Sequence, residues 1–396
     1  MKVMLLIPHI SDGGAEKILS DLSFNLEMGE IVLVVFEKRP GYPFQGRLLS
    51  MDLPIEKNSM IGRALGFVRR TVRFKRLLRK EQPDCVISFM GEANFINALV
   101  APRPILTVHN HLSSSSYLRG KMEARIFDVL LKTLYTRAAI IAVSDTIKAD
   151  LVTYFGIPED RIAVIVTSVD GEQIRSRAAE EVDCPWDRTA PVIITVGRLH
   201  PLKGQWHLLR AFAEVRKTMN CRLAILGTGE LEEYLRRLAR ELGIEKDVSF
   251  LGWQENPFKF LARADLFVLS SVTEGLSLVL MEAMACRLPV ISTRCLGPAE
   301  ILAPRGAAEF GMLTPAVDER MYSGADPLTP EEAAMADAML QMLSNPELRQ
   351  RYIAAGLERL KDFDRAVFLE KYRQVIRSVG KEPQEAQEAQ EKSRFS

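Results

Sequence analysis

TEGLSLVLME, residues Thr273–Glu282, is the stretch that decides the expected fold. It follows DLFVLSS (Asp265–Ser271), which predicts a short buried strand, and it runs on into the apolar LVLMEAMA, which predicts a helix. The order strand, glycine loop and helix directs backbone N–H groups and the positive end of a helix dipole at a phosphorylated ligand. Glu274 in the loop and Glu282 in the helix would reach different parts of one extended ligand. The alternative is a helix cap at Glu274 and a surface charge at Glu282.

Strand-like apolar runs alternate with helix-like periodic segments on both sides of this stretch. One series extends from Lys2–Ile7 to Ile162–Val166, and a second begins at PVIITVG (Pro191–Gly197). The alternation predicts the α/β class, with two doubly wound, Rossmann-like domains of parallel strands that face each other across a cleft. In such sheets ligands bind at the carboxyl ends of the strands. The charged, aperiodic segment Gly171–Ala190 is expected to connect the two domains.

Four parts of the chain are expected from this pattern. Residues 1–175 form an amino-terminal domain and residues 176–358 a carboxyl-terminal domain. A helix at 359–380 follows, with Asp364 as its expected cap. The last segment, 381–396, has almost no apolar residues and is expected to be disordered.

Composition excludes several classes of protein. Of the 396 residues 47% are apolar and 26% charged, as in a soluble globular protein, and the net charge of +1 provides no field to attract nucleic acid. Five scattered cysteines without CxxC spacing indicate reduced thiols in a cytoplasmic protein. No apolar run approaches the roughly 20 residues of a membrane span.

A glycine pair lies in SDGGAEK (Ser11–Lys17), between the first strand and its helix. Gly13 and Gly14 permit close approach of a ligand to the backbone at a helix amino terminus. The motif is not G-x-G-x-x-G, so the usual dinucleotide fingerprint is not supported. A tight structural turn is the alternative.

The loop VGRLHPLKG (Val196–Gly204) follows the first strand of the second series. Arg198 and Lys203 there combine a forked donor and a point charge, which can hold a diphosphate and neutralise it as it leaves. The alternative is a solvated basic loop.

His109 follows another strand, Ile105–Val108. A neutral imidazole at this place could donate to a sugar hydroxyl or to a developing charge, although a structural histidine is the alternative. His109 and His111 alone make a poor metal site. The D-x-D at Asp362–Asp364 precedes a helix and is expected to cap it rather than to bind a metal.

Residues 61–80 predict a basic amphipathic helix with eight basic and no acidic residues. Its apolar side is expected to include Leu65, Val68 and Val72. Such a helix can lie on an anionic membrane surface, or it can cover the core with a solvated basic face. The candidates for membrane association on the basic side are Arg69, Arg70, Arg73 and Arg76.

Together these motifs resemble the retaining glycosyltransferases of family 4, which have the GT-B fold. The resemblance is carried by the glycine pair, by GR-x4-KG at Gly197–Gly204 and by E-x7-E before PVIST (Pro289–Thr293), and it extends from Met1 to about Val379. The GGAEK form of the glycine loop is similar to that of bacterial enzymes that build lipid-linked or cell-surface oligosaccharides. One departure is TSVD (Thr167–Asp170), where the family often has an asparagine-glycine turn.

The resemblance implies roles for the motif residues, first for those of the second half. Arg198 and Lys203 would bind the nucleotide diphosphate, Glu274 the transferred sugar and Glu282 the ribose. Catalytic roles would fall to His109, Arg198, Lys203 and Glu274. The loop residues expected near sugar and phosphate are Gly275, Leu276, Ser277 and Leu278.

In the first half, the resemblance implies that Gly13 and Gly14 line the cleft near the donor phosphates and the acceptor, and that His109 contacts the donor sugar. The terminal helix would cross back to the first domain. Retention would come from same-face attack, with the departing phosphate taking the acceptor's proton and the protein positioning the reactants. No metal or other cofactor is expected if Arg198 and Lys203 supply the charge.

These motifs leave several hypotheses for the function open. The leading hypothesis is a cytoplasmic glycosyltransferase, peripheral at the inner membrane face if the basic helix binds lipid. The donor would be a nucleotide-diphosphate sugar, with uridine favoured over guanosine by resemblance, and the acceptor a glycan or a polyprenyl-diphosphate-linked oligosaccharide. An epimerase or hydrolase acting on the nucleotide sugar, and a non-catalytic binding subunit, are the other hypotheses. The sugar, the linkage and the oligomeric state are not specified by these motifs.

Overall fold

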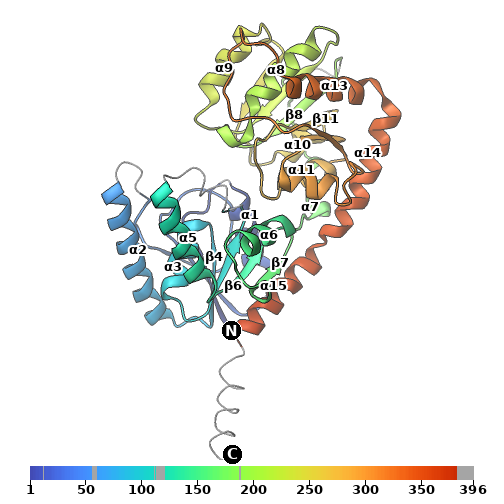
Figure 1. The fold of residues 1–396 in the computed structure, drawn as a ribbon. Helices are drawn as coiled ribbons and strands as arrows, with labels where there is room; N and C mark the ends of the chain where they lie inside the picture. Colours follow the sequence, from blue (N-terminus) through green and yellow to red (C-terminus); the bar gives the residue numbers. More distant parts are fainter. Residues whose placement is uncertain (12, 56–59, 111, 113–120, 187–188, 381–396) are drawn as a thin grey trace, which may run out of the picture. The chain divides into compact units, whose positions relative to one another are not determined.

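The computed structural model describes residues 1–11, 13–55, 60–110, 112, 121–186 and 189–380. The chain divides into two compact units (Figure 1). The first combines Met1–Thr167 with the segment that begins at Ala366, and the second is Ser168–Arg365. The expected disordered segment 381–396 lies outside the described residues.

The first unit is built on a parallel sheet with the strand order β3-β2-β1-β4-β5-β6-β7. β1 (Lys2–Ile7) is central, and its residues from Val3 onward are fully buried because helices cover both faces of the sheet. The other strands are β2 (Glu30–Val35), β3 (Arg47–Ser50), β4 (Cys85–Phe89), β5 (Pro104–Val108), β6 (Ala139–Ala142) and β7 (Ile162–Val164). β3 is an addition to the expected strands: RLLS is short, lies at the edge and is only half-buried.

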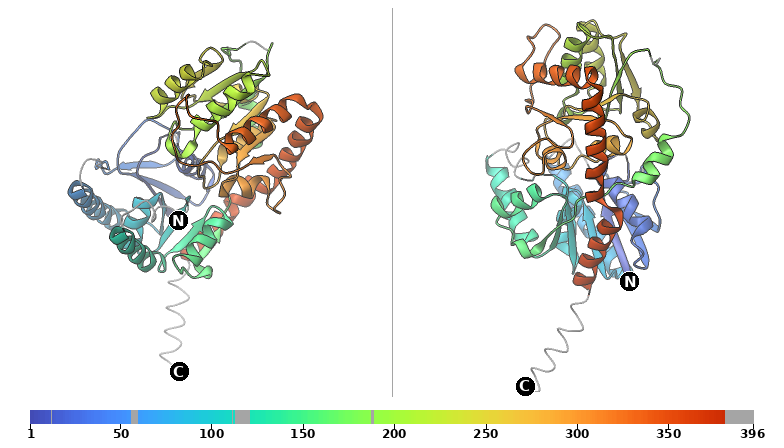
Figure 2. Two further views of the ribbon diagram at one scale, coloured as in Figure 1. Left: turned by 45° about the horizontal axis from the view of Figure 1, so that its top comes forward. Right: turned by 90° about the vertical axis from the view of Figure 1, so that its right-hand side faces the viewer.

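The helices of the first unit include one from the far end of the chain. α2, α3 and α5 are neighbours on this unit (Figure 1). α15, the red helix near the amino terminus in Figure 2, also packs here. Arg373 of α15 donates hydrogen bonds to the carbonyls of Leu26 and Asn25 at the end of α1, each at 3.0 Å. The helices are α1 (Gly14–Asn25), α2 (Met60–Glu81), α3 (Gly91–Val100), α5 (Lys121–Tyr135), α6 (Asp145–Thr153) and α15 (Arg365–Gly380).

α2 has the expected extent, but the side that it buries differs from the expected one. Arg70 is 1% exposed and donates to Glu92 of α3 at 2.7 Å and to the carbonyl of Pro54 at 2.6 Å. Leu65, Val68 and Val72 are about half exposed instead of facing the core. The guanidinium is buried because it satisfies both a carboxylate and loop carbonyls, which a helical wheel cannot reveal. Arg70 is therefore wrong as a membrane-association candidate.

The second unit has a parallel sheet of order β10-β9-β8-β11-β12-β13. Its strands are β8 (Val192–Val196), β9 (Arg222–Leu226), β10 (Val248–Gly252), β11 (Leu266–Leu269), β12 (Val290–Thr293) and β13 (Met312–Thr314). Its helices are α7 (Gly171–Ala178), α8 (Gln205–Arg216), α9 (Glu232–Glu241), α10 (Phe258–Leu261), α11 (Leu278–Ala285), α12 (Leu296–Leu302), α13 (Pro330–Ser344) and α14 (Pro346–Arg359). The expectation of two Rossmann-like α/β domains is confirmed.

The segment expected to be an aperiodic connection begins with a helix. Asp170 caps α7 by accepting a hydrogen bond from the backbone N–H of Gln173 at 2.9 Å, and it also pairs with Arg365. The cap explains why a short charged segment is helical. The division between the units falls at Thr167 and Ser168, earlier than the expected 175, and again at Arg365 and Ala366.

None of the helices in the described part of the chain is both long and apolar enough to cross a membrane.

Candidate functional site

Lys203 lies at the end of a short turn that follows β8. The turn is a single 3₁₀ element, Pro201–Lys203, in which the His200 ring nitrogen Nδ1 accepts a hydrogen bond from the N–H of Leu202 at 3.2 Å. Gly204 ends it with φ of 57°, where an added Cβ would collide with the carbonyl oxygen of Ser270. The sequence PLKG thus places a lysine directly before the first turn of α8.

The structure brings Lys203 and Glu274 together across the edge of the second sheet. The Lys203 ammonium forms an ion pair with the Glu274 carboxylate, whose Oε2 also accepts a hydrogen bond from Ser271 Oγ at 3.2 Å. Both side chains are only partly exposed, at 26% and 15%. The pair forms because β8 and β11 are neighbours, so the loops that follow them meet. A cation and a carboxylate side by side can contact an anionic group and a hydroxyl of one ligand.

The glycine loop after Glu274 packs closely against α12. The Gly297 N–H donates to the Glu274 carbonyl at 3.4 Å, and an added Cβ on Gly297 would collide with the Gly275 carbonyl. Ser277, 1% exposed, precedes α11, and its hydroxyl makes no hydrogen bond within the described residues. Leu276 and Leu278 on either side of it are half-buried.

Glu282 lies on α11 and is 6% exposed. The alternative expectation of a surface charge is therefore wrong. A buried carboxylate costs free energy unless it is paired or hydrogen-bonded, so this residue has a specific place in the fold.

Arg198 is exposed on the same loop as Lys203. Its carbonyl accepts a hydrogen bond from Gln205 Nε2 at 3.0 Å, and the next residue, Leu199, donates to Thr228 after β9 at 2.9 Å. This hydrogen bond connects the loop after β8 with the loop after β9. Glu274 comes from a third loop, the one after β11.

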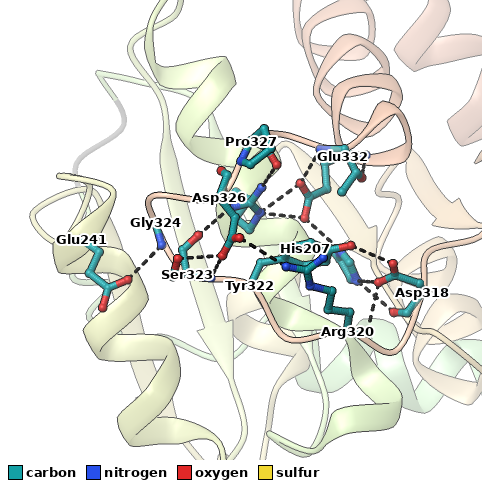
Figure 3. A network of polar contacts seen from close by, with 12 residues as sticks. His207, Glu241, Asp318, Arg320, Tyr322, Ser323, Gly324, Asp326, Pro327 and Glu332 are labelled. Atoms are coloured by element: carbon teal, nitrogen blue, oxygen red, sulfur yellow. Dashed lines mark hydrogen bonds and ion pairs between the residues drawn. The ribbon is translucent and has the colours of Figure 1, made fainter.

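A buried charge cluster joins α8 to α13 (Figure 3). His207 Nδ1 is 2.8 Å from Glu332 Oε1, and Arg210 Nε donates to both oxygens of Glu332 at 2.9 and 3.0 Å. Burial raises the pKa of Glu332, but hydrogen bonds from His207 and Arg210 outweigh it, and the net pKa is below the usual value. Glu332 is therefore ionised at neutral pH and neutralises a cation on α8.

The same cluster holds a loop over α8 (Figure 3). Arg210 donates to the carbonyls of Ser323 at 2.7 Å and Pro327 at 2.6 Å, and His207 Nε2 is 3.0 Å from the carbonyl of Asp318. These residues are additions to those expected from the sequence. Only the capping box of Thr329 and Glu332 leaves a local sequence signal.

In the first unit, Gly13 and Gly14 begin α1 as expected. An added Cβ on Gly13 would meet the carboxylate of Glu16, which is 2% exposed. His9 Nδ1 lies 3.6 Å from Glu16 Oε1 and 2.9 Å from Ser11 Oγ. His9 and Glu16 extend the set of polar residues at this turn.

His109 follows β5 and is half-buried. Its Nε2 is 3.2 Å from Thr107 Oγ1, and its ring stacks on Phe89 with the ring centres 5.9 Å apart. Burial lowers the pKa of His109 to about 4, so the imidazole is neutral at pH 7.

Within the described residues, no group of three or more His, Cys, Asp or Glu side chains is placed to hold a metal ion. His111 lies outside that part of the chain. Asp362 of the D-x-D motif pairs with Arg359 at 2.6 Å, and Asp364 directly precedes α15.

Comparison with known proteins gives two family matches. Residues 12–173 match the model described as glycosyltransferase family 4, and residues 177–359 the model described as glycosyl transferases group 1. An uncharacterized glycosyltransferase of Methanocaldococcus jannaschii is 31% identical over 337 residues, which cover 78% of this chain and 83% of that protein. An N-acetylgalactosaminyltransferase of Campylobacter jejuni, named for a diphospho-undecaprenol substrate, is 28% identical over 92% of this chain and 96% of its own.

Solved structures share the fold. Anabaena HepE, determined in complex with UDP-glucose, has a TM-score of 0.73 at 18% identity and covers 96% of this chain and 100% of its own. WaaG, a glycosyltransferase of lipopolysaccharide biosynthesis, has a TM-score of 0.73 at 15% identity and covers 95% and 99%.

Proposed function

The chain belongs to the family 4 glycosyltransferases, and we propose that it moves a hexose or N-acetylhexosamine from a UDP-sugar to a glycan or polyprenyl-diphosphate-linked oligosaccharide. The observation that carries the proposal is the Lys203–Glu274 pair at the carboxyl ends of β8 and β11. UDP and UDP-glucose in a structural neighbour support the donor class. The lipid-linked substrate in the name of the Campylobacter relative supports the acceptor class.

In the proposed site, the diphosphate contacts Lys203 and Arg198. These cations neutralise the charge that develops on the leaving diphosphate, so the protein needs no metal for this task. Glu274 accepts hydrogen bonds from hydroxyls of the transferred sugar, and Glu282 from the ribose. Backbone N–H groups of the glycine loop face sugar and phosphate, contributed by Gly275, Leu276, Ser277 and Leu278.

The proposed reaction retains the anomeric configuration. The acceptor hydroxyl attacks from the face that the diphosphate leaves, the bond between anomeric carbon and phosphate oxygen breaks, and the leaving phosphate oxygen takes the acceptor's proton. Neither glutamate acts as a nucleophile. The protein contributes orientation and electrostatic stabilisation of the leaving group. In the first unit, Gly13 and Gly14 contact the acceptor and phosphates, and His109 contacts the donor sugar.

The exposed side of α2 supports a peripheral membrane location. Leu65, Val68 and Val72 are 52%, 56% and 46% exposed at helical spacing. Arg69, Arg73 and Arg76 are exposed on the same helix. An exposed apolar stripe beside basic residues fits the interface of an anionic membrane.

The transfer assay uses the full chain with a panel of nucleotide sugars and lipid-linked acceptors. Lys203→Ala and the nearly isosteric Glu282→Gln should each lower transfer by about 10²-fold or more while the melting temperature stays close to that of the parent protein, since Gln keeps the volume of the buried Glu282 side chain. Lys217→Ala, an exposed lysine of the same unit, is the matched control. Unchanged transfer by both site variants would contradict the assignment. Nucleotide release without acceptor would instead indicate a hydrolase, and binding without turnover a non-catalytic subunit.

Membrane association is tested separately by liposome flotation. Changing Arg69, Arg73 and Arg76 to Gln should weaken binding to vesicles that contain anionic lipid by about 100-fold, at about 1 kcal/mol per cation near the surface. The control changes three exposed arginines of α9, Arg236, Arg237 and Arg240, which alters the net charge equally. Equal binding by the two triple variants would favour a plain solvated helix.

A further inference from the structure

Thr107 connects the His109 ring to a buried polar network in the first unit. The network comprises side chains of β4, α3 and β5, and its members Ser88, Asn94, Asn97 and Thr107 are 0–3% exposed. Phe89 and Thr107 are partners in the β4–β5 register, so the end of each strand contacts the other. Buried polar groups in such positions mostly find partners, which restricts the direction of their hydrogen bonds, although Asn97 Oδ1 has no hydrogen-bond partner among the described residues.

The direction of the Thr107 hydrogen bond follows from one distance. Thr107 Oγ1 is 2.6 Å from the carbonyl oxygen of Ser88. Two oxygens this close require a proton between them, and a carbonyl carries none, so the hydroxyl of Thr107 is the donor. That hydroxyl has no second proton. Toward His109 Nε2, at 3.2 Å, Thr107 can therefore only accept.

The rest of the network holds Thr107 in this arrangement. Asn94 Nδ2 donates to the Thr107 carbonyl at 2.8 Å, and Ser88 Oγ donates to Asn94 Oδ1 at 2.8 Å. Asn97 Nδ2 donates to Ser88 Oγ at 3.0 Å and to the carbonyl of Ile105 at 3.2 Å. Two amides from α3 thus connect the ends of β4 and β5, while the hydrogen bond to the Ser88 carbonyl orients the Thr107 hydroxyl.

We infer that Thr107 is a positioning residue that fixes His109 as its Nε2–H tautomer, so that Nδ1 is the atom that faces a ligand as an acceptor. The ring is neutral because burial depresses its pKa, which leaves the Nδ1 lone pair free of a proton. His109 then recognises a hydroxyl or N–H donor and not a phosphate or a developing oxyanion. In this inference Nδ1 accepts a hydrogen bond, whereas the sequence led to the expectation that the imidazole donates one. It rests on the proposed function in one respect, that the donor is a sugar contacted by His109.

The tautomer itself is measured without any substrate. In the full chain labelled with ¹⁵N-histidine, the His109 resonances are assigned by their loss in His109→Gln. The expected spectrum at pH 7 shows Nε2 in the protonated, pyrrole-like range and Nδ1 in the unprotonated, pyridine-like range. Thr107→Val should move both shifts toward the average of the two tautomers, and Thr107→Ser should restore the original shifts. A proton on Nδ1 in the parent protein, or unchanged shifts in Thr107→Val, would overturn the inference.

The ligand preference is measured with UDP-sugars that each lack one hydroxyl. Thr107→Val should lower kcat/KM for the complete donor by about ten-fold and Thr107→Ser by much less, as expected for one misdirected hydrogen bond. For one position of the series, removing the hydroxyl should lower kcat/KM of the parent protein by about ten-fold. The same change of substrate should leave kcat/KM of Thr107→Val almost unchanged. If kcat/KM falls by the same factor in both proteins at every position, the inference that His109 accepts a hydrogen bond from a sugar hydroxyl would be wrong. The NMR result is independent of this assay, so failure of the proposed transferase activity would be seen separately.

Discussion

Gly204 directly follows Lys203 at a point where the chain passes close to the Ser270 carbonyl. Its φ of 57° is unfavourable for other residues, and a Cβ would also strike the Ser270 carbonyl. Gly204→Ala should therefore destabilise the protein by about 3 kcal/mol, the sum of backbone strain and displacement of the loop. Gly243→Ala is the control, since Gly243 has a similar φ of 70° and open space around its Cβ. It should cost about 1 kcal/mol in urea unfolding. Equal losses would mean that the contact with Ser270 has no energetic weight.

His109 gives a prediction for the dependence of stability on pH. Its pKa is about 4 in the folded protein and about 6.5 in an unfolded chain, so the unfolded state binds more protons between these values. Stability that depends on the neutral ring is therefore present above pH 6.5 and is lost as the pH falls toward 4. Relative to His109→Gln, the parent protein should lose on the order of 2 kcal/mol of unfolding free energy between pH 7.5 and pH 4.5. Urea titrations of both proteins at both pH values measure the free energies of unfolding. If the difference between the parent protein and His109→Gln is the same at the two pH values, the prediction is wrong.

At the scale of elements, α2 and α3 are joined by Arg70 and Glu92. Arg70→Ala removes a buried side chain and leaves the carboxylate of Glu92, which is 23% exposed, without its partner, so it should cost about 2–4 kcal/mol. Arg73→Ala, on the exposed side of the same helix, should cost less than about 0.5 kcal/mol. Chemical denaturation of both variants tests this. Similar costs would place Arg70 at the surface, as the helical pattern alone suggested.

The charge cluster that joins α8 to α13 predicts a local change of dynamics. Glu332→Gln removes the charge that neutralises Arg210 and weakens the contact with His207, and should loosen residues 318–327 together with the first turn of α8. Hydrogen exchange measured by mass spectrometry should become faster in both segments. Asp337→Asn, an exposed change on the same helix α13, should leave exchange there as it was. Faster exchange spread evenly over the second unit would instead indicate global destabilisation.

Elements and site differ in how far the sequence predicts them. The strand Cys85–Phe89 was predicted with its observed ends, because strands buried on both faces are continuous apolar runs. The extent of α2 was also predictable, but its buried side was not, because Arg70 enters the core through partners from a loop and from α3. Lys203 and Glu274 were each predicted from a local motif. Their ion pair depends on β8 and β11 being neighbours, and local periodicity does not specify strand order.

At the scale of the whole molecule, the two units differ in continuity: the second is one continuous segment of the chain, whereas the first is made of two segments. Residues 168–365 are continuous and contain their own core around Trp206 and Phe212. Residues 1–167 lack α15, whose Phe368, Leu369, Tyr372 and Ile376 are 0–8% exposed in the whole chain. Four buried apolar side chains contribute about 6 kcal/mol or more, comparable with the whole stability of a domain. A fragment of residues 1–167 should therefore melt without a cooperative transition, and joining residues 366–380 to it by a flexible linker should restore one.

The continuous unit carries the last prediction, since residues 168–365 include Arg198, Lys203, Glu274 and Glu282. If these four residues bind the donor nucleotide, the isolated fragment should fold cooperatively and UDP should raise its melting temperature by mass action, by several degrees at 100 times the dissociation constant. The Lys203→Ala fragment should fold equally well and lose most of that shift, because the diphosphate loses its point charge. Differential scanning fluorimetry with UDP, with GDP and without nucleotide makes the comparison and also tests the choice of base. A fragment that folds but responds to no nucleotide would show that these residues do not form a donor site on their own, and the assignment of the donor to this unit would be wrong.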